Sequence, residues 1–142
     1  MLVLVVEDEP MIAASIEWEL LDAGYDVLGP AGCVAEAEAL VAASRPDLAL
    51  IDINLAGHDE GVALARELKA RQGVPCVFVT GQVVQARQAA DAALGVLTKP
   101  FSFRALVETV PVAAAVAEGR RPARLPRGLE LFGGDCAVAD AS

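Results

Sequence analysis

Short apolar runs alternate with longer segments of helical spacing along this chain. Five runs have the length and composition of strands, and they cover residues 2–6, 25–28, 48–51, 74–79 and 95–97. Between them, apolar side chains recur every three or four residues, which predicts helices over 10–23, 34–41, 62–72, 83–94 and 103 to about 118. This order of elements is typical of an α/β domain built on a parallel sheet with helices on both faces.

Local signals set the ends of several of these helices. Pro10 suits a first helical turn, and Gly24 suits the position just after a helix. Ser102 is a good cap for the last helix. Pro111 lies within that helix and lacks a backbone donor, so we expect a kink or an interruption there.

Four of the apolar runs stop at polar side chains suited to phosphate chemistry. These side chains are Glu7 and Asp8, Asp52, Thr80 and Lys99. Open parallel sheets bind ligands at the carboxyl ends of their strands, so these five residues are expected to meet in one cleft. Singly, each has an ordinary explanation, because acids and lysines often lie in solvated loops and Asp or Thr often caps a turn. Their joint occurrence favours a shared function.

Three carboxylates in one cleft repel one another, and a bound divalent cation relieves that repulsion. Oxygen ligands favour Mg²⁺. Asp8 and Asp52 are candidates for direct ligands, Glu7 for a ligand directly or through a water, and Asn54 for a ligand through its backbone carbonyl. A cation here would also neutralise an incoming phosphoryl group.

Asp52 is the central carboxylate, so we interpret it as a nucleophile that forms an aspartyl phosphate. The Thr80 hydroxyl and the Lys99 ammonium would then hold the other phosphoryl oxygens. Asp52, Thr80 and Lys99 are therefore the candidate catalytic residues.

Composition limits the classes of protein that fit this chain. Of its 142 residues 55% are hydrophobic, yet no apolar stretch approaches the roughly 20 residues of a membrane helix. The apolar start runs directly into Glu7, Asp8 and Glu9, which argues against a secretory signal, so we expect a cytoplasmic protein with no membrane partner. The net charge of −9 disfavours binding to nucleic acid. Cys33, Cys76 and Cys136 form no CxxC pair, so neither a disulfide framework nor a zinc site is indicated.

The domain is expected to span residues 1–118, followed by a different kind of segment. Residues 119–142 begin with a basic, proline-containing stretch without helical periodicity, so we expect a disordered tail. The alternative is that the tail folds back onto the acidic body or docks a partner. No effector domain fits in that length. The output is therefore expected to be a protein contact or onward phosphotransfer.

Four motifs together resemble those of the response regulator receiver domains of bacterial two-component signalling. They are LVVEDEP at 4–10, LALIDINL at 48–55, VFVTG at 77–81 and LTKPF at 97–101. The resemblance implies a doubly wound, five-stranded parallel sheet in the flavodoxin-like order 2-1-3-4-5. It also implies Asp52 as the phosphoacceptor, dependence on Mg²⁺, and a cis peptide between Lys99 and Pro100, which an X–Pro bond permits. The implied donor is a sensor histidine kinase or a histidine phosphotransfer protein, and the output is a contact with a downstream protein.

Two departures from the usual receiver pattern indicate a subgroup. Ordinary receivers have an aromatic residue three positions before the lysine, where this chain has Val96, and the segment from Thr80 to Lys99 is shorter than usual. With FVTG at 78–81, the chain resembles the atypical receivers named for a Phe-Ala-Thr-Gly motif, although Val79 replaces the alanine. That resemblance implies a stand-alone receiver that works with kinases of the HWE or HisKA2 type, with output through reordering of residues 81–94.

Two other functions fit parts of the pattern. A Mg²⁺-dependent phosphatase of the haloacid dehalogenase type also uses an Asp nucleophile, but on the first strand and with a second Asp two residues later, where this chain has Asn54. A pseudo-receiver that acts only as an interaction surface would not need the acids, Thr80 and Lys99. We therefore expect a phosphoacceptor signalling domain and no enzyme beyond self-catalysed phosphotransfer and dephosphorylation.

Overall fold

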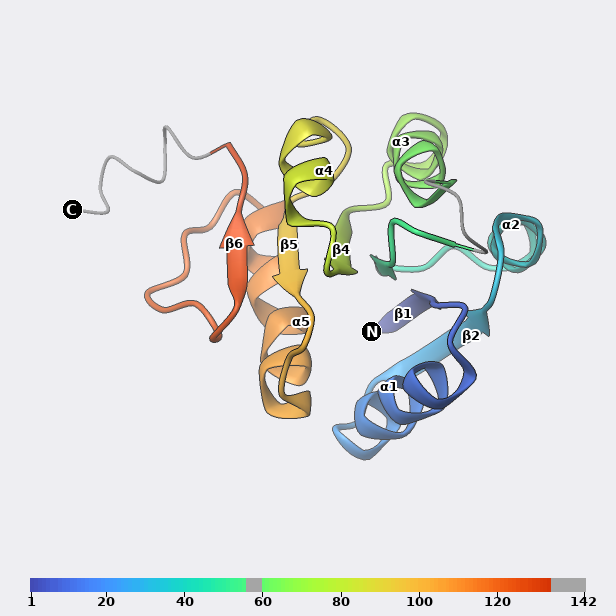
Figure 1. The fold of residues 1–142 in the computed structure, drawn as a ribbon, viewed down its shortest axis with the longest axis horizontal. Helices are drawn as coiled ribbons and strands as arrows, with labels where there is room; N and C mark the ends of the chain where they lie inside the picture. The colour runs from blue at the N-terminus through green and yellow to red at the C-terminus, as the bar shows by residue number, and fades with distance from the viewer. Residues whose placement is uncertain (56–59, 134–142) are drawn as a thin grey trace.

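The fold is a mixed sheet with helices on both faces, seen in a computed structural model that describes residues 1–55 and 60–133 (Figure 1). Its strands in these ranges are β1 (Leu2–Val6), β2 (Asp26–Ala31), β3 (Leu48–Ile51), β4 (Cys76–Thr80), β5 (Gly95–Thr98) and β6 (Leu129–Leu131). Its helices are α1 (Pro10–Asp22), α2 (Val34–Ala43), α3 (Glu60–Gln72), α4 (Val83–Gln88) and α5 (Phe103–Ala117).

The strand order is β2-β1-β3-β4-β5-β6, and the first five strands are parallel. The predicted order 2-1-3-4-5 is therefore confirmed for those five. The prediction of a five-stranded sheet is wrong, because β6 adds an antiparallel strand at the β5 edge. β6 lies in the segment expected to be disordered, so that expectation fails for residues 129–131. Residues 134–142 of that segment, including Cys136, lie outside the described residues.

Two apolar layers enclose the sheet. Helices α2, α3 and α4 cover one face, and α1 and α5 cover the other (Figure 1). Side chains alternate between the layers along each strand, as the pleat requires. In β4, for example, Phe78 joins the first layer, whereas Val77 and Val79 join the second. The central strands are therefore buried on both sides, and all four residues of the continuous apolar run of β3 are buried.

Several element boundaries differ from the prediction. α4 covers six residues instead of twelve, because it buries only Ala86 and so has little tertiary packing to extend it. Ser102 does cap α5, since its hydroxyl accepts a hydrogen bond from the Ala105 amide at 3.0 Å. The interruption expected at Pro111 does not occur, because Val110 and Ala113 on either side pack against the sheet and hold α5 continuous. None of the helices in the described ranges has the length and apolar character needed to cross a membrane.

Candidate functional site

The polar residues at the strand ends meet where the strand order changes direction, between β1 and β3. Glu7 and Asp8 follow β1, Asp52 follows β3, Thr80 ends β4 and Lys99 follows β5. Backbone hydrogen bonds fix these ends to one another. The Asp52 amide donates to the Val6 carbonyl at 3.0 Å, and the Lys99 amide donates to the Thr80 carbonyl at 3.0 Å. The predicted convergence of the five residues is therefore confirmed, while their chemical roles stay predictions.

The Lys99 ammonium lies between two buried carboxylates. Its Nζ is 2.8 Å from Oε1 of Glu7 and 3.0 Å from Oδ2 of Asp52. Glu7 is 3% exposed and Asp52 is 7% exposed, whereas the Lys99 side chain is 20% exposed at the mouth of the cleft. The second Glu7 oxygen accepts a hydrogen bond from the Glu9 amide at 3.1 Å. Lysine thus cross-links the ends of β1, β3 and β5.

Burial and charge shift the pKa values of this cluster. Burial raises the pKa of the Glu7 carboxyl, and the hydrogen bonds from Lys99 and from the Glu9 amide offset only part of that effect. Burial works to lower the pKa of the Lys99 ammonium. Its hydrogen bonds to Glu7 and Asp52 and their negative charge outweigh burial, so the pKa of Lys99 is raised. Lys99 therefore stays a cation at neutral pH.

Three carboxylates in the cleft form a donor set for a divalent cation. One oxygen from each of Glu7, Asp8 and Asp52 lies within 4.8 Å of the others. Glu7 and Asp52 are buried, so one lysine leaves this cluster of three acids with excess negative charge in a poorly hydrated place. Hard carboxylate oxygens at this spacing fit Mg²⁺. The side-chain oxygen of Asn54 is also buried, with no hydrogen-bond partner among the residues that the structure describes.

The cleft has room for a phosphoryl group. It has a volume of about 300 Å³, and its lining includes Asp8, Asp52, Asn54, Thr80 and Lys99. The Thr80 hydroxyl oxygen accepts a hydrogen bond from the Gln82 amide at 3.0 Å, and its O–H donates to no acceptor among the described residues. The Asn54 amide donates to Oδ1 of Asp52 at 3.3 Å.

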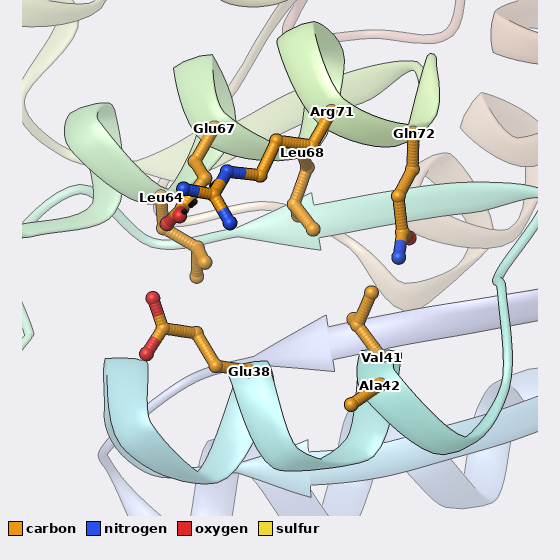
Figure 2. Close-up of a pocket in the computed structure, with 8 residues that line it drawn as sticks. All are labelled: Glu38, Val41, Ala42, Leu64, Glu67, Leu68, Arg71 and Gln72. Carbon is orange, nitrogen blue, oxygen red and sulfur yellow. Dashed lines mark ion pairs between the residues drawn. The ribbon is translucent and has the colours of Figure 1, made fainter.

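A second hollow lies between α2 and α3 and has a different character (Figure 2). Its volume is about 310 Å³, and Val41, Leu64 and Leu68 supply apolar lining. Glu38 on α2 faces Glu67 on α3, where Arg71 pairs with Glu67 at 3.3 Å. A hydrogen bond with Glu67 and that residue's negative charge raise the pKa of the Glu38 carboxyl. This groove holds none of the residues predicted for phosphate chemistry, so the cleft at the strand ends is the candidate site.

Comparison with known proteins agrees with this geometry. Residues 3–111 match the family model of the response regulator receiver domain. The chain belongs to the response regulator receiver domain family. The transcriptional regulatory protein PdtaR of Mycobacterium tuberculosis is 33% identical to this receiver over 116 residues, which are 80% of this chain and 56% of PdtaR. The receiver thus spans about half the length of the curated relatives it matches.

Solved structures show the same fold. The receiver domain of a modulated diguanylate cyclase from Desulfovibrio desulfuricans G20 is 36% identical, with a TM-score of 0.73 over 82% of this chain and 95% of that one. A CheY-like receiver domain protein from Methanospirillum hungatei JF-1 is 27% identical, with a TM-score of 0.72 over 83% of this chain and 96% of that one. The receiver fold is therefore shown, and the cis Lys99–Pro100 peptide implied by the resemblance is present.

One residue that positions the site was missed from the sequence. Gly61 lies in the first turn of α3, and its amide donates to the Ile53 carbonyl at 2.9 Å. A Cβ atom at this glycine would lie 2.1 Å from the carbonyl oxygen of Asp52. The helix can approach the Asp52 backbone this closely only because residue 61 has no side chain. A lone glycine near a helix start gives no such signal in the sequence.

Proposed function

We propose that this receiver accepts a phosphoryl group on Asp52 from a phosphohistidine of a sensor histidine kinase or a histidine phosphotransfer protein, and signals through altered contacts with a downstream protein. One observation carries the proposal: Lys99 and the carboxylates of Glu7, Asp8 and Asp52 surround a cleft that also contains the Thr80 hydroxyl. Beyond this self-catalysed transfer and the later hydrolysis, we assign no enzymatic activity.

Asp52, Lys99 and Thr80 have different roles in the proposed phosphoryl transfer. A carboxylate oxygen of Asp52 forms a bond to phosphorus while the bond from phosphorus to the donor imidazole nitrogen breaks, and that nitrogen keeps the electron pair. The Lys99 ammonium, now 3.0 Å from Oδ2 of Asp52, pairs with a phosphoryl oxygen. The Thr80 hydroxyl donates to another. Hydrolysis of the acyl phosphate by water returns the Asp52 carboxylate and releases inorganic phosphate.

The acidic cluster would hold Mg²⁺. Asp8 and Asp52 would be direct ligands, Glu7 would bind directly or through a water, and Asn54 would contribute its backbone carbonyl. When bound, Mg²⁺ neutralises charge on the carboxylates and on the incoming phosphoryl group. This assignment rests on the spacing of the three carboxylates and on the burial of Glu7 and Asp52.

We further propose membership of the Phe-Ala-Thr-Gly subgroup and a kinase of the HWE or HisKA2 type in the cytoplasm. Val96, in place of the aromatic residue of ordinary receivers, supports this. Output would come from reordering of residues 81–94, which include the short α4 with its single buried residue, Ala86. If amide exchange over residues 81–94 is identical with and without a phosphate mimic, that route is wrong.

Intact-mass measurement after incubation with acetyl phosphate and Mg²⁺ tests the phosphoacceptor. The wild type is expected to gain one phosphoryl group, and Asp52→Asn none. Asp26→Asn is the matched control. Asp26 begins β2, at the amino ends of the strands, whereas the cleft lies at their carboxyl ends, so this variant should still gain the phosphoryl group. Steady phosphate release without a labelled intermediate would instead favour a phosphatase, and the absence of any Mg²⁺-dependent effect would favour a pseudo-receiver.

A further inference from the structure

The C-terminal strand covers the whole free edge of β5. Within β6, Leu129, Glu130 and Leu131 pair with Leu97, Val96 and Gly95. Two further hydrogen bonds extend this pairing. The Thr98 amide donates to the Gly128 carbonyl at 3.0 Å, and the Phe132 amide donates to the Leu94 carbonyl at 2.8 Å. We call residues 128–132 the C-terminal strand segment.

The same segment holds α4 through an ion pair. The Arg87 guanidinium donates from Nη2 to Oε1 of Glu130 at 2.7 Å and from Nε to Oε2 at 3.0 Å. Arg87 lies in the last turn of α4. Both side chains are partly exposed, 57% for Arg87 and 41% for Glu130, so the pair is a weak tie that is easily broken.

β5 is shaped to receive this segment. A Cβ atom at Gly95 would lie 2.2 Å from the carbonyl oxygen of Glu130, a distance that no side chain tolerates. Leu129 is only 7% exposed and packs in the layer under α5, whereas Phe132 packs against the layer on the α4 face. Figure 1 shows β6 beside β5 at the edge of the sheet. The side chains of Leu129 and Phe132 add packing to this backbone pairing.

β5 and α4, the two elements that the C-terminal strand segment contacts, both adjoin the cleft at the strand ends. Lys99 directly follows β5, and Thr80 ends β4 with two residues between it and the start of α4. The Thr80 hydroxyl oxygen also accepts the amide hydrogen of Gln82, the residue that caps α4. The Lys99 ammonium now pairs with Glu7 and Asp52, so its movement toward a phosphoryl group would change the ion pairs at the end of β5. A movement of the Thr80 side chain toward that group would shift the acceptor of the hydrogen bond at the start of α4.

We propose that the C-terminal strand segment is an autoinhibitory strand, whose pairing with β5 and with Arg87 is coupled to the Asp52 site and weakened when Asp52 carries a phosphoryl group. This rests on the proposed function. Release of the segment leaves the backbone groups of β5 unpaired beside the Arg87 cation. That edge fits an extended segment of a partner with a carboxylate opposite Arg87, as Glu130 is now.

Hydrogen exchange in the full-length protein tests the coupling. The amides of Phe132 and Thr98 report the pairing with β5, and the Ala49 amide, which donates to the Pro75 carbonyl inside the sheet, is the control. Beryllofluoride with Mg²⁺ serves as the phosphoryl mimic, and fluorine NMR measures its binding independently. We expect bound mimic to accelerate exchange at Phe132 at least threefold and to leave Ala49 unchanged.

The reciprocal experiment follows from linkage, since binding at each site must change the other by the same factor. Glu130→Gln weakens the tie to Arg87 and is expected to raise the affinity for beryllofluoride about two- to fivefold, the range of an exposed ion pair. Arg87→Gln should match it, and the double variant should add nothing further. Glu118→Gln is the control, because Glu118 pairs with Arg120 outside the segment.

The outcomes separate the two proposals. Bound mimic with unchanged exchange at Phe132, or additive effects of Glu130→Gln and Arg87→Gln, overturns the autoinhibitory strand and leaves the phosphoacceptor intact. Wild-type protein that binds the mimic no better than Asp52→Asn overturns both.

Discussion

Replacement of Lys99 with methionine tests the electrostatic structure of the cleft most directly. Lys99 is the cation that contacts both Glu7 and Asp52, at 2.8 and 3.0 Å. Methionine keeps most of the length of the side chain and removes the charge. Glu7, which is 3% exposed, then loses its charged partner and keeps only the Glu9 amide as a donor among the contacts that the structure describes.

The size of the effect follows from this geometry. At these distances, with an effective dielectric constant of about 20, the attraction in each pair is on the order of 5 kcal/mol, and desolvation offsets most of it. Removal of one partner from a buried pair costs about 3–5 kcal/mol. The Lys99 side chain is 20% exposed, so water can partly solvate the acids left behind. We therefore expect a loss of about 2–4 kcal/mol in the free energy of unfolding.

Urea unfolding, followed by circular dichroism, measures this loss. With a denaturant slope of about 2 kcal/mol per molar, the midpoint should fall by about 1–2 M. Lys69→Met is the matched control, because Lys69 lies on the exposed side of α3 and contacts only the Asp91 carbonyl among the described hydrogen bonds. Its midpoint should change little. Lys99→Met combined with Glu7→Gln should recover part of the stability, because one of the two buried charges left by Lys99→Met is then gone.

Mg²⁺ provides the decisive comparison. Without the Lys99 ammonium, the net charge of the cluster is more negative by one. The three carboxylates should therefore bind the cation more tightly. A tenfold gain in affinity adds about 1.4 kcal/mol of stabilisation by saturating Mg²⁺. The midpoint of Lys99→Met should therefore rise more with Mg²⁺ than that of the wild type. An equal or smaller rise would refute the placement of the cation site beside Lys99.

Three further predictions concern single positions. Gly61→Ala should slow phosphorylation by acetyl phosphate and cost about 1–3 kcal/mol, because its Cβ would overlap the Asp52 carbonyl, whereas Gly81→Ala, with open space around it, should cost less than about 1 kcal/mol in urea unfolding. Ser102→Ala should lower the free energy of unfolding by about 1 kcal/mol through loss of the helix cap, and no change would mean that the cap is not needed. Burial raises the pKa of the Cys76 thiol to about 12, so iodoacetamide at pH 8 should modify Cys76 only after unfolding, as peptide mapping would show, while partly exposed Cys33 reacts in the folded protein.

The parallel part of the sheet and the cleft were predictable because they depend on local patterns. An apolar strand that ends at Asp52 needs only a short continuous apolar run and a polar stop, and the carboxyl ends of neighbouring parallel strands must share one edge. The positions of Glu7, Asp8, Thr80 and Lys99 followed from the same rule. Their meeting in space was therefore implied by the order of the strands.

The features that the sequence did not predict depend on contacts between distant segments. β6 has only three residues, and its pairing with β5 satisfies backbone groups and buries Leu129, which no local period reveals. The ion pair between Arg87 and Glu130 joins residues 43 positions apart. Pro111 gave a true local signal, but the packing of α5 on the sheet outweighs it. In each case, contacts between segments distant in sequence determine the structure, and no local pattern shows those contacts.

The missing aromatic residue and the added strand meet at the same place. Val96 is fully buried and pairs in register with Glu130. A valine side chain is too short to move between an inward and an outward position as a large ring does. A movement of Thr80 therefore cannot be transmitted to the protein surface by rotation of the side chain at position 96. The remaining routes are the α4 segment and the backbone of β5. Both end on the C-terminal strand segment, which is why its coupling to Asp52 should be strongest in a receiver with a small residue at position 96.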